Sequence, residues 1–220
     1  MIQNTLTAIG VAALCLAATH PGPAAAHPHV WVSASAVLEF TGEHEVRAIT
    51  VRYALDELTT AVLIEGLDAN SNGVFEREEL KALAAENAES LSEFDYFVEV
   101  SAGGKRVGTQ EVTAYDYSYD DGQMVLVLQL ALERHIDPAE EDLAVRLYDP
   151  SFYVLVELQD ENPLLVAGVD ADFCRVSINA PTLSSDGVSI SDAVLQSVDP
   201  ESSIGRDYAD VIALTCGVSG

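Results

Sequence analysis

Short segments in which apolar and polar residues alternate run through most of the sequence after residue 29. This alternation is typical of β-strands, because successive side chains of a strand point to opposite faces of a sheet. Turn signals such as Thr41-Gly42-Glu43-His44 and Asp120-Asp121-Gly122 favour hairpins between neighbouring strands. The pattern therefore predicts a β-rich chain with strands at 29–40, 46–55, 98–101, 105–115, 124–132, 143–148, 152–158, 166–178 and 208–216.

The hydrophobic period changes between residues 56 and 91, where it predicts two helices, over 56–67 and 76–91. In the second helix Leu80, Leu83, Ala84, Ala88 and Leu91 fall on one face. We therefore predict a mainly β, antiparallel, sandwich-like domain at 27–220 with a helix–loop–helix inserted at 56–91. A two-layer α+β sheet is the alternative architecture.

Residues 1–26 have the pattern of a secretory signal peptide. An apolar run at 6–18 is followed by a break at His20-Pro21-Gly22-Pro23, and Ala24-Ala25-Ala26 offers a cleavage site. The run is too short for an ordinary membrane-spanning helix, and no later apolar stretch is long enough to anchor the mature chain. We predict a periplasmic or secreted protein; a cytosolic amphipathic N-terminus is the alternative.

The charge balance limits the partners of the protein. The chain has 36 Asp+Glu against 10 Lys+Arg, which gives a formal net charge of −26. Nucleic-acid binding requires a basic surface that neutralises phosphates, and an anionic membrane face attracts basic segments. We therefore expect neither partner; such an acidic surface attracts cations or a basic protein instead.

Two cysteines, Cys174 and Cys216, remain after the leader and its Cys15 are removed. In an oxidising compartment two cysteines most simply pair, and we predict a disulfide between them. A bridge closing so long a loop contributes about 4 kcal/mol in the chain-entropy model. A two-thiolate metal site is the alternative, although no C-x-x-C spacing supports it.

Residues 68–79, DANSNGVFEREE, fit the calcium loop of an EF-hand. Gly73 stands where the loop turns sharply. The predicted oxygen ligands, some of them side chains and one a backbone carbonyl, are Asp68, Asn70, Asn72, Val74, Glu76 and Glu79. Two neutral asparagines lower the ligand charge, so we expect weak, structural calcium binding. The alternative is an Asn/Gly turn that only joins two helices.

Cleavage after Ala26 leaves His27-Pro28-His29 at the mature N-terminus. The α-amine and imidazole of His27 can chelate a metal, and His29 adds a second imidazole. Such nitrogen ligands suit Cu, Ni, Co and Zn. Pro28 has no amide hydrogen, so the square-planar mode through deprotonated amides is blocked. We predict a transition-metal site at His27 and His29; a frayed terminus with solvated histidines is the alternative.

Sequence motifs of common enzyme classes do not occur in this chain: we find no H-E-x-x-H, G-x-S-x-G, P-loop or dinucleotide fingerprint. No segment combines a nucleophile with a base. We therefore expect no enzyme activity, and the one enzymatic alternative is a copper oxidase or monooxygenase built on the N-terminal histidine.

Several segments together resemble a bacterial family of unknown function. Its members are described as periplasmic components of ABC-type transport systems and are often encoded beside nickel/cobalt-type permeases. The matching pieces are HPHVWV at 27–32, DANSNG at 68–73, YDPSFYV at 148–154, Cys174 and IGRDYADVIALTC at 204–216. The resemblance implies a periplasmic accessory or substrate-binding protein for divalent transition-metal transport, with a membrane permease as partner. A calcium-stabilised extracellular interaction domain with no transport role is the alternative.

Overall fold

Two β-sheets form most of the protein in the computed structural model, which describes residues 30–112, 114–181 and 204–217. The first sheet, sheet A, has the strand order β5-β6-β2-β1-β8, and β9 also pairs with β1. Its strands are β1 (Val30–Phe40), β2 (Val46–Leu55), β5 (Ala114–Asp120), β6 (Gln123–Ile136), β8 (Val154–Leu158) and β9 (Leu164–Ala167).

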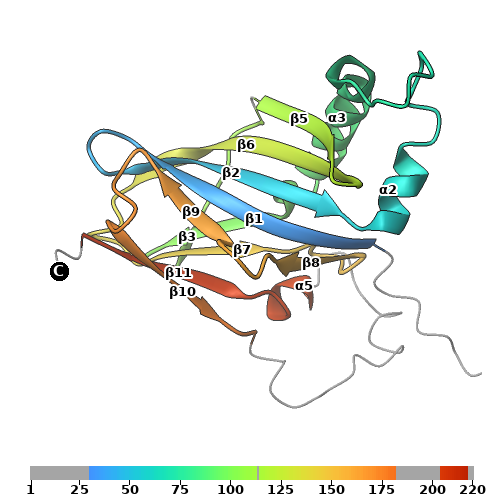
Figure 1. The fold of residues 1–220 in the computed structure, drawn as a ribbon. Coiled ribbons are helices and arrows are strands. Elements are labelled where there is room, and N and C mark those ends of the chain that lie inside the picture. Colours follow the sequence, from blue (N-terminus) through green and yellow to red (C-terminus); the bar gives the residue numbers. More distant parts are fainter. Residues whose placement is uncertain (1–29, 113, 182–203, 218–220) are drawn as a thin grey trace, which may run out of the picture.

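The second sheet, sheet B, has the order β10-β11-β7-β3-β4, and every pair in it is antiparallel. Its strands are β3 (Val98–Ala102), β4 (Lys105–Val107), β7 (Leu143–Leu147), β10 (Cys174–Asn179) and β11 (Val211–Cys216). Figure 1 shows β1, β2 and β6 of sheet A above β3, β7 and β11 of sheet B. The prediction of a mainly β, sandwich-like fold is confirmed.

One hydrophobic core joins the two sheets. Leu38, Ile49 and Leu128 of sheet A and Val145 and Ile212 of sheet B are all fully buried in the same cluster. Alternate residues of β1, from Val32 to Phe40, point into this core, which is the burial pattern that their period of two predicts. We call the core-facing side of each sheet its inner face.

The parallel pairing of β1 is the main departure from the predicted antiparallel architecture. β1 forms an antiparallel hairpin with β2 through the turn at 41–45, as predicted. On its other side it pairs in parallel with β8 and β9, which lie more than a hundred residues later in the chain. β1 is therefore an internal strand of sheet A.

Two predicted strands are wrong because the chain changes sheet within each of them. The range 105–115 divides into β4 of sheet B and β5 of sheet A. Between them Gly108 lies so close to β6 that a Cβ there would be 2.5 Å from the Glu133 side chain. The range 166–178 divides into β9 and β10. Gly168, with φ +88°, lies against the Phe40 carbonyl and turns the chain towards sheet B.

Helices α2 (Glu57–Leu63) and α3 (Arg77–Ser92) lie between β2 and β3, where helices were predicted, and α3 ends one residue beyond its predicted range. Asp56 caps α2 by accepting a hydrogen bond from the Thr59 backbone N–H at 2.9 Å. The predicted extension of α2 to residue 67 is wrong. Turns replace the helix after Leu63, and Gly66 adopts φ +83°, a left-handed conformation that ends helices. Leu80, Ala84 and Ala88 pack α3 into the core.

A left-handed turn follows α3 at the short 3₁₀ segment η1 (Asp95–Phe97). Asp95, Tyr96 and Phe97 have φ values of 51°, 56° and 61°, a conformation that costs about 1–2 kcal/mol for each non-glycine residue. Side chains hold the turn in place. The Tyr53 hydroxyl donates to the Tyr96 carbonyl at 2.9 Å, and the Tyr96 hydroxyl accepts from the Val112 N–H at 3.2 Å.

Within the part of the chain that the structure describes, no helix has both the length and the apolar character needed to cross a membrane. The four-residue α5 (Ile204–Asp207) precedes β11.

Candidate functional site

The loop between α2 and α3 folds around the side chain of Asp68. The Asp68 carboxylate accepts hydrogen bonds from the backbone N–H groups of Asn72 at 3.0 Å and Gly73 at 2.8 Å. Gly73 has φ +79°, which glycine adopts without the steric cost of a side chain. The sharp turn predicted at this position is therefore present.

Two glutamates at the start of α3, the N-cap residue Glu76 and Glu79 of the first turn, join the loop side chains. Glu76 accepts hydrogen bonds from the side-chain amides of Asn70 at 3.2 Å and Asn72 at 2.6 Å. The bond from Asn72 is the largest cause of the lowered pKa of Glu76, so this carboxylate is ionised at neutral pH. Glu79 accepts from the Ala69 backbone N–H at 2.9 Å and from the Glu76 N–H at 3.1 Å. The first turn of α3 is thereby tied to the start of the loop.

The donor set of this loop fits a hard cation that prefers oxygen. Ca²⁺ takes about six to eight oxygen ligands, and the loop gathers carboxylate and amide oxygens in one hydrogen-bonded network. The Val74 backbone N–H donates to the Asn72 side chain at 2.7 Å, which brings the Val74 peptide into the same network. No group of three or more His, Cys, Asp or Glu side chains in the described residues is arranged to hold a metal ion. Calcium would therefore require the asparagine oxygens and the Val74 carbonyl as well as the carboxylates.

His27 and His29, the predicted transition-metal ligands, lie outside the described residues. The strand that follows them begins at Val30 and pairs in parallel with β8, with Val30 opposite Val154. The Trp31 N–H donates to the Asp56 side chain at 3.2 Å, and the Asp56 N–H donates to the Trp31 carbonyl at 3.0 Å. The starts of β1, β8 and α2 thus lie together at one end of the sandwich (Figure 1).

An ionic cluster that the sequence did not predict joins sheet B to α5. Glu99 of β3, whose exposed fraction is 6%, lies at its centre. It accepts hydrogen bonds from Arg206 Nε at 2.8 Å and Nη2 at 2.9 Å, from Arg146 Nη1 at 2.7 Å and from the Tyr148 hydroxyl at 3.0 Å. One buried carboxylate therefore pairs with two guanidinium groups.

The cluster shifts the pKa values of its acidic members in opposite directions. Burial by itself raises the pKa of Glu99, but the hydrogen bonds from Arg206 and Tyr148 and the charges of both arginines outweigh it and lower the pKa. Burial, followed by the negative charge of Glu99, raises the pKa of Tyr148 to about 12. At neutral pH Glu99 is therefore ionised and Tyr148 is protonated, so the phenol donates to the carboxylate.

The segments 148–154 and 204–216 pack directly on each other beside this cluster. The Asp149 side chain, 3% exposed, accepts hydrogen bonds from the backbone N–H groups of Ser151 and Val154, both at 2.8 Å. A Cβ at Gly205 would overlap the Asp149 carbonyl oxygen, so only glycine fits there. The rings of Phe152 and Tyr208 lie 5.4 Å apart. Two segments that are distant in the sequence therefore form one structural unit.

A disulfide joins Cys174 to Cys216, as predicted. The two residues lie opposite each other on the antiparallel strands β10 and β11, and 42 residues separate them in the sequence. Since both sulfurs are used in the bond, the two-thiolate metal site is excluded.

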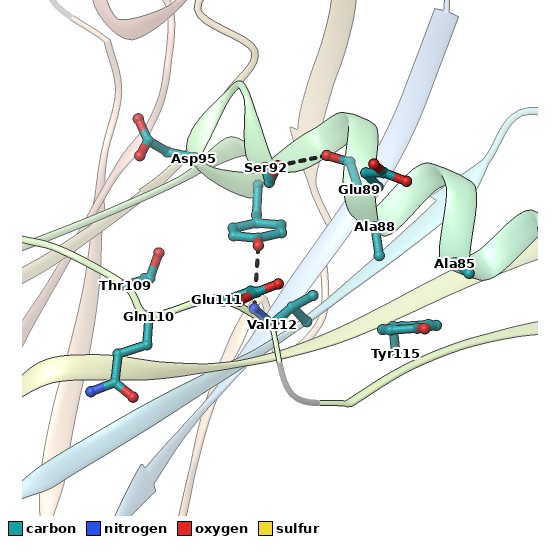
Figure 2. Close-up of a pocket in the computed structure, with 11 residues that line it drawn as sticks. Ala85, Ala88, Glu89, Ser92, Asp95, Thr109, Gln110, Glu111, Val112 and Tyr115 are labelled. Carbon is teal, nitrogen blue, oxygen red and sulfur yellow. Dashed lines mark hydrogen bonds between the residues drawn. The ribbon is translucent and has the colours of Figure 1, made fainter.

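A polar cavity of about 550 Å³ lies between α3 and the segment before β5. Figure 2 shows Glu89 and Ser92 of α3 on one side and Glu111 and Tyr115 on the other. Asp95 also lines this cavity and forms an ion pair with Arg106 at 2.8 Å. The carboxylates of Glu89, Asp95 and Glu111 line this cavity and disfavour an anionic ligand.

Only two of the four residues of the ionic cluster lie in segments that the family resemblance singled out. Tyr148 and Arg206 occur inside the two segments that supported the family resemblance. Glu99 and Arg146 each occur as a charged residue within an apolar strand, a pattern that predicts a solvent-facing side chain. Only the register between β3 and β7, which places Glu99 opposite Arg146, makes them partners.

Comparison with known proteins places the chain among proteins whose activity is not described. An uncharacterised 15.5 kDa protein in the trpE 3′ region of Spirochaeta aurantia is 28% identical over 118 residues. The aligned part is 53% of this chain and 84% of that relative. The model of the family described as "Protein of unknown function (DUF1007)" matches residues 12–216, which is most of the chain. The chain therefore belongs to the DUF1007 family.

Proposed function

We propose that this protein is an exported metal-binding accessory protein of divalent transition-metal transport, and that calcium stabilises it at loop 68–79. The observation that supports metal binding best is the hydrogen-bonded network in which Asp68, Asn70, Asn72, Glu76 and Glu79 converge. Hard cations prefer such carboxylate and amide oxygens. A bound ion would hold the start of α3 against the beginning of loop 68–79.

The transport role rests on the N-terminal histidines and on the family resemblance. His27 would contribute its α-amine and imidazole, and His29 a second imidazole, to Ni, Co, Zn or Cu. The described strand β1 begins at Val30, directly after them in the sequence, and its first residues contact β8 and Asp56. A membrane permease that passes the metal on or receives it is the proposed partner.

A calcium-stabilised interaction domain without a transport role is the second candidate. The hydrogen-bonded network of loop 68–79 supports both candidates equally, because calcium binding there does not depend on His27 or His29. The two candidates differ in one measurable property: only the first requires transition-metal binding.

Calcium is expected to raise the melting temperature, and Glu79→Gln is expected to remove most of that rise. A ligand that binds only the native state adds RT ln(1 + [L]/Kd), about 1.4 kcal/mol at tenfold excess over Kd. Because two of the side-chain ligands are neutral, we expect that millimolar calcium is needed. Differential scanning calorimetry over a calcium series measures the shift.

Glu78→Gln is the matched control for this experiment. Glu78 lies in the same helical turn and is exposed, whereas Glu79 is partly buried and hydrogen-bonded to the loop. The control should respond to calcium as the wild type does. If Glu79→Gln also keeps the full response, residues 68–79 are a turn and not a calcium site.

The transition-metal site is expected to depend on correct N-terminal processing. One additional residue before His27 moves the α-amine away, and His29→Ala removes an imidazole. Each change should weaken Cu²⁺, Ni²⁺ or Zn²⁺ binding by at least about tenfold, the loss that even an outer-shell partner can cause. Acidic pH should weaken binding too, because the metal displaces protons from imidazole and amine. Titration calorimetry of the native, extended and His29→Ala forms measures all three affinities.

The calcium response of these forms serves as the internal control, since loop 68–79 is a separate site. If the extended form and His29→Ala bind transition metals as tightly as the native form, the N-terminal site does not exist. The interaction-domain candidate then remains.

A further inference from the structure

A second cavity, of about 200 Å³, lies between the two helices and the inner face of sheet A. Helix α2 contributes Leu63 to its wall and helix α3 contributes Asn87 and Leu91. Strands β1, β2, β5 and β6 form the opposite wall, with Tyr117 and Leu126 next to each other in the β5–β6 register. The cavity is therefore lined by both helices and strands, opens to solvent on one side, and is separate from loop 68–79 and from the ionic cluster.

The wall of this cavity is uncharged. Leucines from α2, α3, β2 and β6 and the rings of Tyr53 and Phe97 supply most of it. Among the described residues that line it there is no Asp, Glu, Lys, Arg or His, although the chain has 46 acidic and basic residues in all, 36 Asp+Glu plus 10 Lys+Arg. An ionised ligand would lose its hydration there without gaining a counter-charge. The lining therefore selects a neutral, largely apolar molecule.

Tyr117 supplies a polar contact of the cavity, which Thr59, Asn87 and Ser90 also line. Its hydroxyl is buried, and it accepts a hydrogen bond from the Asn87 side-chain amide at 2.9 Å. A phenol can accept and donate at the same time, and among the hydrogen bonds of the described residues none uses the Tyr117 proton. The Tyr53 hydroxyl differs, because it donates to the Tyr96 carbonyl. Burial raises the pKa of Tyr117, so its proton stays available to an acceptor.

The volume sets the size of the ligand. An apolar cavity of about 150 Å³ is sufficient to bind benzene. A cavity of about 200 Å³ therefore has room for one aromatic ring with a small substituent.

We infer that this cavity binds an uncharged single-ring aromatic molecule that carries one oxygen acceptor. The ring packs against the leucines of both helices, and the oxygen accepts the proton of the Tyr117 hydroxyl. Because both helices form the wall, the bound ring also holds α2 and α3 against sheet A. This site does not require metal binding and stands independently of the proposed function.

The test compares phenol with toluene, which has the same ring but no oxygen acceptor. Each probe is titrated into the full mature chain, and ¹H–¹⁵N NMR follows the backbone signals. Phenol is expected to bind with one-to-one stoichiometry and to shift signals of residues that line the cavity. Tyr117→Phe should weaken phenol binding about fivefold to tenfold, the effect of one net hydrogen bond, and leave toluene binding unchanged.

Two further variants separate binding in the cavity from surface binding. Tyr119→Phe removes a hydroxyl from the same strand at a residue that is 40% exposed and does not line the cavity. It should bind both probes as the wild type does. Leu63→Trp places a larger side chain at the partly buried rim and should abolish binding of both probes.

Three results would each overturn the inference. The first is that neither probe shifts the signals of the lining residues. The second is that Leu63→Trp, shown by circular dichroism to be folded, binds both probes unchanged. The third is that Tyr117→Phe affects phenol and toluene equally, because the hydroxyl then gives no selectivity for an oxygen acceptor.

Discussion

Gly205→Ala is expected to lower the free energy of unfolding by about 3 kcal/mol, the upper end of the usual cost of overpacking. A Cβ at this position would overlap the Asp149 carbonyl oxygen and lie 2.9 Å from its carbonyl carbon. Both atoms belong to the backbone, so no side-chain rotation can relieve the contact. Asp149 in turn holds the chain before β8 through its buried carboxylate. Equilibrium urea unfolding measures the loss.

Gly42→Ala is the matched control for this substitution. Gly42 lies in the turn between β1 and β2, and apart from its chain neighbours no described residue has an atom within 4 Å of the position of its Cβ. Neither glycine has a positive φ, so the two variants differ in available space and not in backbone strain. Gly42→Ala should change stability by no more than about 0.5 kcal/mol. Equal losses in both variants would show that α5 and Asp149 are not packed as described.

Glu99→Gln is expected to lower the free energy of unfolding by about 3 kcal/mol at neutral pH, the lower end of the usual loss when a buried ion pair is broken. The glutamine keeps the shape of the side chain and can still accept from Tyr148, but it removes the negative charge that pairs with Arg146 and Arg206. The side chain of Arg206 is 41% exposed, and water therefore recovers part of the loss. Chemical unfolding of the wild type and the variant gives the difference.

The cost of Glu99→Gln should shrink on acidification. The pKa of Glu99 is lower in the folded protein than its ordinary value of 4.5. A carboxylate with a depressed pKa contributes stability that is fully present above the unfolded pKa and lost as pH falls through the folded pKa. The difference between wild type and variant should therefore be constant above about pH 5 and decrease below pH 4.5. Unfolding curves over a pH series measure this dependence.

Glu141→Gln provides the control for both measurements of Glu99. On the exposed surface, the Glu141 carboxylate accepts a hydrogen bond from each of the Arg134 atoms Nη1 and Nη2, both at 2.7 Å. Exposed pairs of this kind contribute about 0–1 kcal/mol, so the substitution should have little effect. If the cost of Glu99→Gln matches that of Glu141→Gln, or does not vary with pH, the ionic cluster does not stabilise the fold.

Local patterns predicted the parts of the fold that depend on neighbouring residues. The β1–β2 hairpin, the start of α2 and the sharp turn at Gly73 all depend on contacts between segments that are adjacent in the sequence. The parallel pairing of β1 with β8 could not be predicted in this way, because both strands satisfy the same alternation in either direction. The strand at 105–115 was wrong because sequence periodicity does not show when a strand leaves one sheet for another.

The candidate sites likewise depend on contacts between distant segments as well as on local patterns. Tyr115, Tyr117 and Tyr119 alternate along β5, which predicts one exposed face or binding surface. In the structure Tyr117 is 3% exposed, whereas Tyr115 and Tyr119 are 41% and 40% exposed. The Asn87 side chain of α3 reaches the middle tyrosine, and only the packing of α3 on β5 makes Tyr117 part of a cavity. Contacts between distant segments therefore define the features that the sequence did not show.

The internal position of β1 affects the order in which the chain can fold during synthesis. Its hairpin with β2 can form as soon as residues 30–55 have left the ribosome, but β8 and β9 follow only at residues 154–167. Until then one side of β1 presents unpaired N–H and C=O groups, which other chains can recruit. Strand pairings of such high sequence separation are also slow to form. The nascent chain is therefore most prone to aggregate between these two stages, and a fragment that ends after β7 would keep this edge of β1 open.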